Sequence, residues 1–310
     1  MRSIQNEQIK RACRLQKQRG AKSGMSEEKT ESSVDDIDDR PSSFGESVKR
    51  EAMEWARLLV VFIPVLFVFS LLGFEQRVIP SESMIPNLQV GDRVLVNKFS
   101  YGYSRYSIPW GVGRIIPTGK GRVFASEPER GDVIVFMHPH FRRVMIKRLI
   151  GLPGDRIQVR NEQVYLNDVA VPTEYIRDMS YIPHTKRFPQ ATRETQETHG
   201  DKTFLTHQWQ PNREGDNTPI FIVPEGHFLF MGDNRDNSID GRFTSGHCPA
   251  ENNIISEAGC TPLISLERAS VGFVPFDNLI GKGVTIAWTT KRCRKGPGLA
   301  CPPKRVWKGL

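Results

Sequence analysis

The longest apolar stretch in the chain runs from Leu58 to Phe74, reads LLVVFIPVLFVFSLLGF and carries no charge. At about 1.5 Å per helical residue it would cover about 26 Å, close to the thickness of a bilayer core. Its apolarity is continuous rather than amphipathic, which favours a membrane span over a buried helix of a soluble protein. It begins too far from the N-terminus for a cleaved secretory signal. We therefore expect a single transmembrane helix with its flanks over residues 49–76.

The charged residues beside this stretch predict its orientation. Lys49, Arg50 and Arg57 lie on its N-terminal side, and Glu51 and Glu54 offset their charge only in part. Basic residues close to a span stay on the cytoplasmic side, so the N-terminus should be cytoplasmic. Everything after the apolar stretch should then lie on the far side of the membrane.

Residues 1–48 are polar and contain very few large apolar side chains. Such a segment buries too little apolar surface to offset the entropy lost on folding, so we expect a disordered cytoplasmic tail. The acidic residues between Glu27 and Asp39 argue against an organelle transit peptide.

After Arg77 the apolar positions occur in short runs that Gly, Pro, Asn and Asp separate, which is typical of β-strands joined by turns. These runs are Val133–Phe136, Val144–Ile146, Ile157–Val159, Val164–Leu166 and His227–Met231. Asn161-Glu162 and Asn167-Asp168 predict turns. Long helices do not alternate with the runs, so a parallel α/β sheet is not expected. We predict a β-rich domain over residues 77–290.

Candidate chemistry begins with two serines, Ser81 and Ser83, about nine residues beyond the apolar stretch in IPSESMIPNLQVGDRVLVNK, residues 79–98. Prolines on both sides of the serines disfavour a helix and predict an extended, rigid loop. A hydroxyl on a stiff loop close to a membrane is a candidate nucleophile. A serine-rich turn without chemistry is the alternative.

Lys147 interrupts the apolar strand pattern of VMIKRLIGLPGD, residues 144–155. A period of two places its side chain on the same face as Met145 and Leu149. Burial there should lower the pKa of the lysine from about 10.4 towards neutrality. A neutral amine beside a serine hydroxyl can act as the general base of a Ser-Lys dyad. The alternative is a lysine that extends its amine from the strand end into solvent.

A third stretch, MGDNRDNSIDGR at residues 231–242, is too rich in small and charged residues for a core strand and predicts a hydrogen-bonded loop. With this loop the chain resembles the bacterial type I signal peptidases (leader peptidases), which are membrane-bound Ser-Lys proteases. The resemblance covers roughly Trp55 to Trp288 and rests on four motifs in family order: PSESM, GDVIVF, IKRLIGLPGD and GDNRDNSID. One departure is Gly241, where the family commonly has serine.

The resemblance implies catalytic roles for three residues. Ser83 would be the nucleophile, and Lys147 would be its general base. The Ser81 hydroxyl would form the oxyanion hole together with the backbone N–H of Ser83.

The resemblance also implies supporting residues around this dyad. Ser238 would orient the lysine amine, and Asp240 with Arg242 would support the loop through an ion pair. A shallow apolar pocket for alanine-sized substrate side chains would suit the small-residue cleavage site of secretory signals. The candidate pocket residues are Ile79, Met84, Leu88 and Ile146.

For the fold, the resemblance implies a mostly β architecture: an antiparallel β-sheet protease core with an inserted β subdomain, behind the single N-terminal transmembrane helix. Residues 175–218, polar and irregular in pattern, would fall in that insertion. Residues 243–270 separate two motifs that lie closer together in the family, and they form an extra insert of unknown role. Residues 291–310 form a basic extension, which we expect to be a solvated tail.

The formal net charge of +8 and the pI near 9.3 would suit nucleic acid or an anionic membrane surface. The basic residues are dispersed and no nucleic-acid module accompanies them, so proximity to a membrane explains the charge better. The resemblance implies preprotein signal peptides as substrates and the lipid bilayer as a partner, with the secretion translocon as a further candidate. It also implies the bacterial inner (cytoplasmic) membrane, a periplasmic catalytic domain and no cofactor.

The cysteines of the chain are Cys13, Cys248, Cys260, Cys293 and Cys301. The last four could form two disulfides if their side of the membrane is oxidising, and local pairing, Cys248 with Cys260 and Cys293 with Cys301, is our hypothesis. Zinc is the alternative, although neither pair has the short spacing of a Cys-x-x-Cys site.

His138 and His140 form a His-x-His pair after a predicted strand. Further metal ligands do not stand at a recognisable spacing from them, so we expect exposed loop histidines and no metal site.

Other functions remain open at this point. Self-cleaving repressors also use a Ser-Lys dyad on a similar β core, but the membrane span and the GDNRDNS loop do not fit them. A related peptidase for a specialised substrate, pilin-like or conjugative, is harder to exclude. A non-enzymatic, membrane-tethered binding module is an alternative from a different class. Cleavage of a preprotein by the purified chain, abolished by Lys147→Met, would separate enzyme from binding module.

Overall fold

The computed structural model describes residues 44–107, 121–183, 188–209, 211, 213, 215–243, 254–255, 271–290 and 305–310. The cysteines, and with them the two predicted disulfides and the alternative zinc site, lie outside these residues. The same holds for the tail before Phe44 and for almost all of the 243–270 insert.

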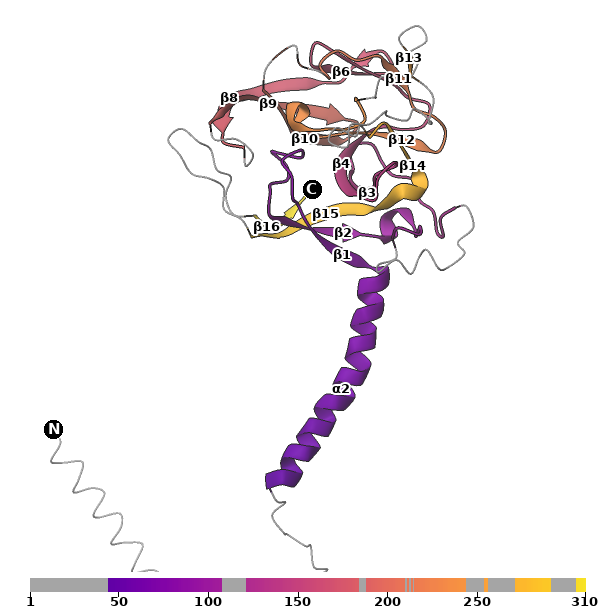
Figure 1. The fold of residues 1–310 in the computed structure, drawn as a ribbon, viewed down its shortest axis with the longest axis vertical. Helices are drawn as coiled ribbons and strands as arrows, with labels where there is room; N and C mark the ends of the chain where they lie inside the picture. Colours follow the sequence, from indigo (N-terminus) through magenta and orange to yellow (C-terminus); the bar gives the residue numbers. More distant parts are fainter. Residues whose placement is uncertain are drawn as a thin grey trace, which may run out of the picture. The chain divides into compact units, whose positions relative to one another are not determined.

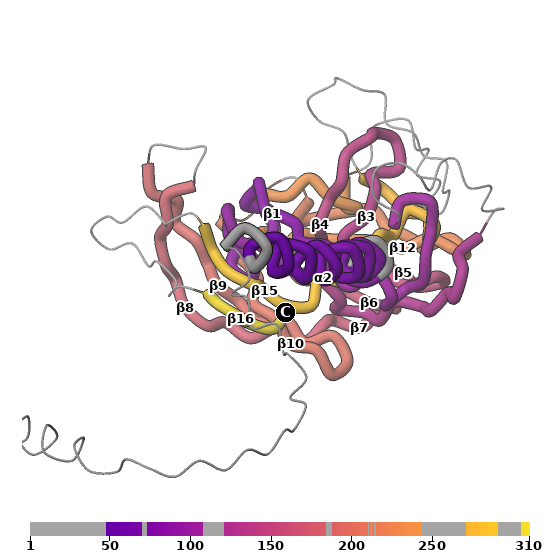
Figure 2. The backbone as a smooth tube through the Cα atoms, turned by 90° about the horizontal axis from the view of Figure 1, so that it is seen from below, coloured from indigo at the N-terminus to yellow at the C-terminus, as the bar shows by residue number. Residues whose placement is uncertain are grey.

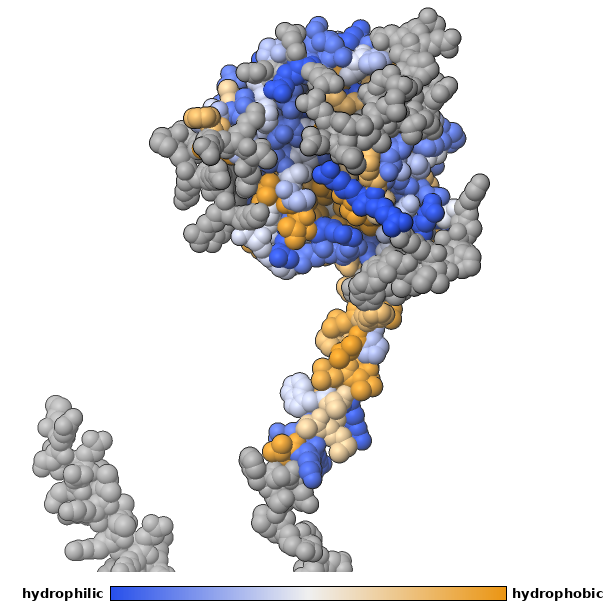
Figure 3. Space-filling view, viewed as in Figure 1, coloured by the Kyte–Doolittle hydropathy of each residue, from blue (hydrophilic) through white to orange (hydrophobic). Residues whose placement is uncertain are grey.

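The N-terminal helix, α2, spans Phe44–Leu72 and contains nearly all of the apolar stretch. Within it, Val48–Phe69 is long and apolar enough to cross a membrane, with a mean hydropathy of 2.0 and no buried share. Figure 3 shows these apolar side chains exposed along the helix. The helix begins inside the segment that we expected to be disordered, and it ends before Phe74, which starts a strand. Gly73 ends it: its N–H closes the last turn on the carbonyl of Phe69 at 2.7 Å.

The largest sheet has eight strands in the order β1-β2-β15-β3-β4-β12-β14, with β16 paired to β15 (Figure 1). Its strands are β1 (Phe74–Val78), β2 (Asp92–Asn97), β3 (Val133–Met137), β4 (Val144–Gly151), β12 (His227–Met231), β14 (Phe273–Pro275), β15 (Leu279–Thr289) and β16 (Val306–Gly309). All of its pairings are antiparallel. The prediction of a mostly antiparallel β fold is therefore confirmed.

Two smaller sheets complete the β structure, and Figure 2 shows β8 and β9 on one side of the view and β5 to β7 on the other. The five-stranded sheet contains β13 (Ile254–Ile255), β11 (Ile220–Ile222), β5 (Arg156–Arg160), β6 (Gln163–Leu166) and β7 (Val169–Ala170). The three-stranded sheet contains β10 (Lys202–Gln208), β9 (Gln190–His199) and β8 (Thr173–Tyr181). Short 3-10 helices occur at Phe99–Tyr101, Arg235–Asn237 and Phe276–Asn278.

The turns Asn161-Glu162 and Asn167-Asp168 are confirmed, because all four residues have positive φ, between 47° and 70°. Asn and Asp tolerate this left-handed conformation better than most residues, and such pairs are typical of tight hairpins. They join β5 to β6 and β6 to β7.

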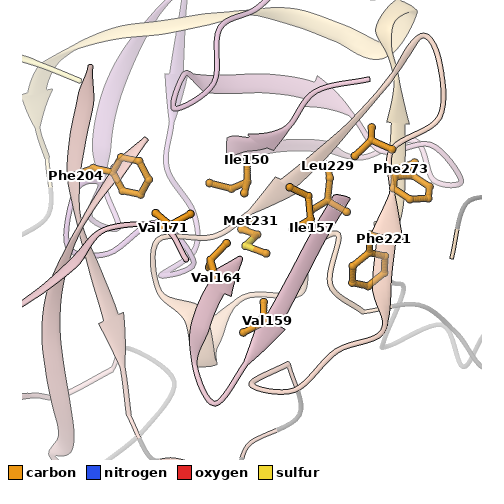
Figure 4. Packing of buried hydrophobic residues seen from close by; sticks show 11 residues of the cluster. Ile150, Ile157, Val159, Val164, Val171, Phe204, Phe221, Leu229, Met231 and Phe273 are labelled. Atoms are coloured by element: carbon orange, nitrogen blue, oxygen red, sulfur yellow. The ribbon is translucent and has the colours of Figure 1, made fainter. Parts of the chain in front are cut away.

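Among the described residues, the buried apolar side chains form three clusters. The first lies between the five-stranded sheet and β4 and β12 (Figure 4). The second lies under β2, β3 and β15 and includes residues of the loop between β1 and β2. The third includes Phe136 and Phe230, whose rings stack with centroids 4.5 Å apart.

The segment expected to fall in an inserted β subdomain, residues 175–218, forms for the most part the regular strands β8 to β10 of the three-stranded sheet, although its sequence pattern is polar and irregular. Its polar side chains pair inside the sheet. Glu194 on β9 contacts His207 on β10 at 3.0 Å, and the hydroxyls of Thr195 and Thr206 are 2.7 Å apart. Polar residues are buried at little cost when such partners satisfy them.

The last residues of the expected solvated tail over residues 291–310 pair with the large sheet. Val306–Gly309 form β16 on the edge of β15 with exposed side chains, whereas Arg305 before them is buried. Backbone pairing with an open strand edge provides partners that an isolated basic segment lacks.

Candidate active site

The loop between β1 and β2 carries the two serines and is closed at its base by backbone hydrogen bonds. The N–H of Ile79 donates to the carbonyl of Asp92 at 2.8 Å, and that of Gly91 donates to Ile79 at 2.9 Å. The loop is not extended as predicted. The N–H of Leu88 donates to the carbonyl of Met84 at 2.8 Å, so this part turns back on itself and satisfies its own backbone groups.

Ser83 and Lys147 meet in this structure although they are 64 residues apart in sequence. The Nζ of Lys147 donates a short hydrogen bond to the Oγ of Ser83. Lys147 lies on β4, opposite Ile134 of β3 in the sheet. Both partners are buried, with 3% of Lys147 and 6% of Ser83 exposed. The two side chains that the sequence analysis predicted as nucleophile and base therefore lie in hydrogen-bond contact.

The environment of Lys147 lowers the pKa of its amine from 10.5 to about 8. Burial is the largest cause, because the charged ammonium loses its hydration. The carboxylates of Asp240 and Asp233 oppose the shift, and the guanidinium groups of Arg143 and Arg242 add to it. A substantial fraction of the amine is therefore neutral near pH 8, as a general base requires.

Ser81 lies beside Ser83 and is exposed. Its Oγ is 3.4 Å from the Oγ of Ser83. A hydroxyl at this position can rotate towards an oxygen that develops charge next to Ser83.

The loop after β12 packs against Ser83 from another side. The backbone N–H of Asn234 donates to the carbonyl of Ser83 at 3.1 Å. Ser238 is buried in this loop, and its Oγ has no hydrogen-bond partner among the residues that the structure describes. Among the described residues, Ser238 therefore does not form the predicted hydrogen bond with Lys147.

Asp240 and Arg242 form the expected ion pair, with Nε 3.0 Å from Oδ1, and both side chains are buried. The other oxygen of Asp240 accepts the backbone N–H of Gly232 at 2.9 Å. Burial alone would raise the pKa of Asp240, but Arg242 and these hydrogen bonds hold it below its usual value. The pair therefore keeps its charges and fixes the loop at both ends.

The predicted pocket residues all lie in one buried cluster of the core. Met84 and Leu88 have no exposed surface, Ile79 has 2% and Ile146 has 9%. Met84 follows Ser83 and Ile146 precedes Lys147 in the chain, so this apolar cluster adjoins both residues.

Two residues that hold the site together, Arg148 and Asn87, were not predicted from the sequence. Arg148, next to the catalytic lysine candidate, donates two hydrogen bonds of 2.7 Å to Asp233. Asn87 donates from its amide to the same carboxylate at 2.7 Å and to the carbonyl of Leu205 at 2.6 Å. Two adjacent charges, Lys147-Arg148, inside an apolar strand were the available signal for a buried partner.

Gly232 is a third residue that the sequence analysis missed. A Cβ at this position would lie 2.5 Å from the carbonyl oxygen of Ser83 and closer still to Ser238. Only glycine therefore fits between the nucleophile and the Ser238 side chain.

The expectation for the histidines is wrong for His138, which is buried with 3% exposed. It accepts the backbone N–H of His140 at 3.1 Å and packs edge-on against Phe141. Among the residues described, the structure contains no cluster of three or more His, Cys, Asp or Glu residues able to hold a metal.

Comparisons with known proteins identify the family that the chain resembles. A family model described as signal peptidase, peptidase S26, matches residues 52–288. Signal peptidase I of Rickettsia bellii (strain OSU 85-389) is 35% identical over 250 residues, 78% of this chain and 75% of that protein. Signal peptidase I of Rickettsia typhi is 36% identical over 242 residues, 74% of this chain and 77% of that protein. A crystal structure of a signal peptidase I from Enterococcus faecalis V583 matches with 24% identity over 51% of this chain and 97% of that chain, at a TM-score of 0.26.

Proposed function

The chain belongs to the signal peptidase family, peptidase S26, and we propose that it is a membrane-anchored serine endopeptidase that removes signal peptides with a Ser83–Lys147 dyad. One observation carries the dyad: the hydrogen bond between the Nζ of Lys147 and the Oγ of Ser83. The lowered pKa of the lysine supports the role of general base.

The mechanism begins when Ser83 Oγ attacks the carbonyl carbon of the peptide bond and neutral Lys147 takes its proton. The resulting ammonium then protonates the leaving amine, which departs and leaves an acyl group on Ser83. Neutral Lys147 next removes a proton from water as the water attacks this ester. The ester bond to Ser83 breaks, the signal peptide leaves with a new C-terminal carboxyl group, and Lys147 returns the proton to the Ser83 oxygen.

The negative charge on the attacked carbonyl oxygen requires two donors. We assign these to the Ser81 hydroxyl and the backbone N–H of Ser83. The distance of 3.4 Å between the two serine hydroxyls supports this assignment, because both groups then flank the same carbonyl.

The loop after β12 has a supporting role in this mechanism. Ser238 would orient the Lys147 amine, and its buried hydroxyl without a described partner is available for that contact. The Asp240–Arg242 pair would hold the loop in place through the Gly232 N–H. These residues act through the dyad and do not themselves change bonds.

The apolar cluster beside Ser83 is the proposed binding pocket for small side chains before the scissile bond. Its members Met84 and Leu88 are fully buried and Ile146 keeps only 9% of its surface exposed, so a recess that the cluster forms next to Ser83 would be shallow. Such a recess would accept alanine and reject larger side chains, in keeping with small-residue cleavage sites.

Helix α2 is the proposed anchor in the bacterial inner membrane, with the N-terminus cytoplasmic and the catalytic domain periplasmic. Ser83 would then remain within roughly 30 Å of the bilayer surface by chain length alone. Anchoring enzyme and preprotein in one membrane raises their effective concentration. The secretion translocon is a further candidate partner.

The test is cleavage of a preprotein by the purified full chain. We expect Ser83→Ala and Lys147→Met to be inactive, and Ser81→Ala to retain activity reduced by about 10²–10³-fold, as for loss of one oxyanion donor. Cleavage that persists in Ser83→Ala would contradict the proposal. A binding module without chemistry would retain the preprotein uncut.

A further inference from the structure

Arg305 lies more than two hundred residues after Ser83 in the sequence, yet its guanidinium reaches the nucleophile loop. Its Nη2 donates to the carbonyl of Pro86 at 2.8 Å, and its Nη1 donates to the carbonyl of Asn87. The side chain is buried, with 7% exposed. These two carbonyls follow Ser83 by only three and four positions in the chain.

The position of Arg305 is fixed by β16, which immediately follows it. Val306 and Lys308 pair with β15, and the Oγ1 of Thr285 donates to the carbonyl of Lys308 at 2.9 Å. Strand β15 also pairs with β2, which leaves the nucleophile loop at Asp92. Strand β15 therefore fixes the positions of both Arg305, through β16, and the end of the loop, through β2.

Asp92 connects Arg305 to the base of the loop. Its carboxylate has no exposed surface and accepts the N–H of Gln89 at 2.8 Å and the hydroxyl of Thr289 at 2.6 Å. The Nη1 of Arg305 lies 3.5 Å from the same carboxylate. The guanidinium is thus held by a buried charge while it binds two loop carbonyls, which a planar fork does better than a lysine ammonium.

Another anchor acts on the same part of the loop. The amide of Asn87 binds Asp233, which also binds Arg148 beside the catalytic lysine. The Asn87 residue is therefore held by its side chain from the Lys147 side and by its carbonyl from the Arg305 side. Two anchors on one short turn leave little freedom for the serine that precedes it.

We propose that Arg305 is a positioning residue for the reaction, which clamps the Pro86–Asn87 turn so that Ser83 stays in register with Lys147. This inference rests on the proposed function for its catalytic consequence. In this proposal the function of residues 305–310 is to hold the Arg305 guanidinium against the loop, because β16 pairs with β15 directly after Arg305. Reacting groups need placement on the scale of about 1 Å, and a displacement of that size can cost about 10²-fold in rate.

The test compares Arg305→Ala with Lys308→Ala in the full chain. Lys308 lies on β16, and its exposed side chain makes it a control for loss of one positive charge from this segment. We expect Arg305→Ala to lower kcat per folded enzyme by about 10- to 100-fold, with KM within about twofold of the parent. Lys308→Ala should keep the parental kcat. Equal kcat in Arg305→Ala and parent would overturn the proposal.

Arg305→Lys is a second, more conservative variant, which tests the proposal if Arg305→Ala fails to fold. It keeps the charge but cannot reproduce the two-carbonyl fork, so its kcat should lie between those of the parent and of Arg305→Ala. A purely structural role would lower the melting temperature while the folded enzyme kept its parental kcat.

Hydrogen exchange provides a readout that does not depend on activity. The amide of Leu88, bonded to Met84 across the turn, should exchange faster in Arg305→Ala and unchanged in Lys308→Ala. A parent that leaves preproteins uncut would refute the proposed function, whereas unchanged exchange at Leu88 would refute the clamp.

Discussion

The chemistry of the site depends on where a single amine is placed. Lys147 sits in a strand that is buried over most of its length, and burial lowers the pKa of its amine to about 8. The folded protein therefore binds the lysine proton more weakly than the unfolded chain does. This favours catalysis but costs stability, because below pH 8 folding must either bury the charge or release the proton.

This cost predicts a pH-dependent effect of Lys147→Met. Between pH 8 and 10.5 the unfolded chain binds more protons than the folded one, so the stability of the parent should rise with pH. The shift corresponds to about 3 kcal/mol at about 1.4 kcal/mol per pKa unit. Methionine does not titrate, so the variant lacks this gain. From pH 7 to pH 10.5 the free energy of unfolding of the parent should therefore rise by about this amount relative to that of Lys147→Met. Denaturant titrations at both pH values measure it, and an unchanged difference would contradict the pKa.

Gly232→Ala should damage the dyad directly. The added methyl group would lie 2.5 Å from the carbonyl of Ser83, so either Ser83 or Ser238 must move. We expect a loss of about 1–3 kcal/mol in stability and about 10²-fold in kcat. Gly309→Ala is the control, because a Cβ there meets nothing within 4 Å. Parental kcat in Gly232→Ala would show that the close packing is not needed.

At the residue level, the sequence predicted Ser83 and Lys147 because their motifs combine chemistry with an unusual local pattern. Gly232, Asn87 and Arg305 were not predicted. Each acts only through contacts with segments distant in sequence, and a glycine, an amide or a basic residue in a loop has no local signature of such a contact.

Strands β8 to β10 illustrate what the pattern of apolar residues misses at the level of elements. They contain few large apolar residues, so the apolar pattern did not locate the individual strands within the expected β subdomain. Their stability derives instead from polar pairs across the sheet, and such pairs appear only once the strand register is known. The strands of the large sheet, by contrast, were recognisable because their apolar runs are continuous and buried.

Glu197 on β9 links this polar sheet to the loop after β12. It binds Arg235 through both oxygens and lies 3.0 Å from His199, and all three side chains are buried. Burial alone would raise the pKa of Glu197, but Arg235 and His199 hold it at about 2. The carboxylate therefore stabilises the fold above pH 4.5, and this contribution is lost as pH falls towards 2.

Glu197→Gln should lower the free energy of unfolding by about 3–5 kcal/mol at pH 7, because it leaves the Arg235 charge buried without its partner. Arg193 lies on the same strand as Glu197, and its side chain is half-exposed where it pairs with Glu162. Arg193→Gln, which breaks this pair, should cost about 1 kcal/mol or less. Chemical denaturation of both variants tests the difference. Equal losses would mean that the buried pair does not hold the loop.

The molecule combines one long apolar helix with a β domain. The buried apolar clusters of this domain contain only residues that follow the helix in the chain. The β domain buries its own apolar clusters, whereas the helix exposes Val48–Phe69 entirely. Such exposed apolar surface is unfavourable in water, and the proposed membrane anchor would place it in lipid. The sequence predicted this division because continuous apolarity is a global feature, although it misplaced the helix ends by several residues.

Val61→Arg combined with Leu66→Arg should release the chain from membranes. Each arginine near the centre of the span costs about 2.5–3.5 kcal/mol of insertion free energy. Glu51→Arg, outside the apolar stretch, should leave membrane association intact. Fractionation after alkaline extraction separates these outcomes, and a double variant that stays in the membrane fraction would argue against the anchor.

The titration of the Lys147 amine, followed by NMR of the labelled full chain alongside kcat/KM for preprotein cleavage, tests the central claim most directly. We predict that the amine titrates near pH 8 and that kcat/KM rises with pH through the same midpoint, because only the neutral amine can take the Ser83 proton. An amine that titrates near its ordinary value of 10.5 while cleavage is already maximal at pH 8 would contradict the account.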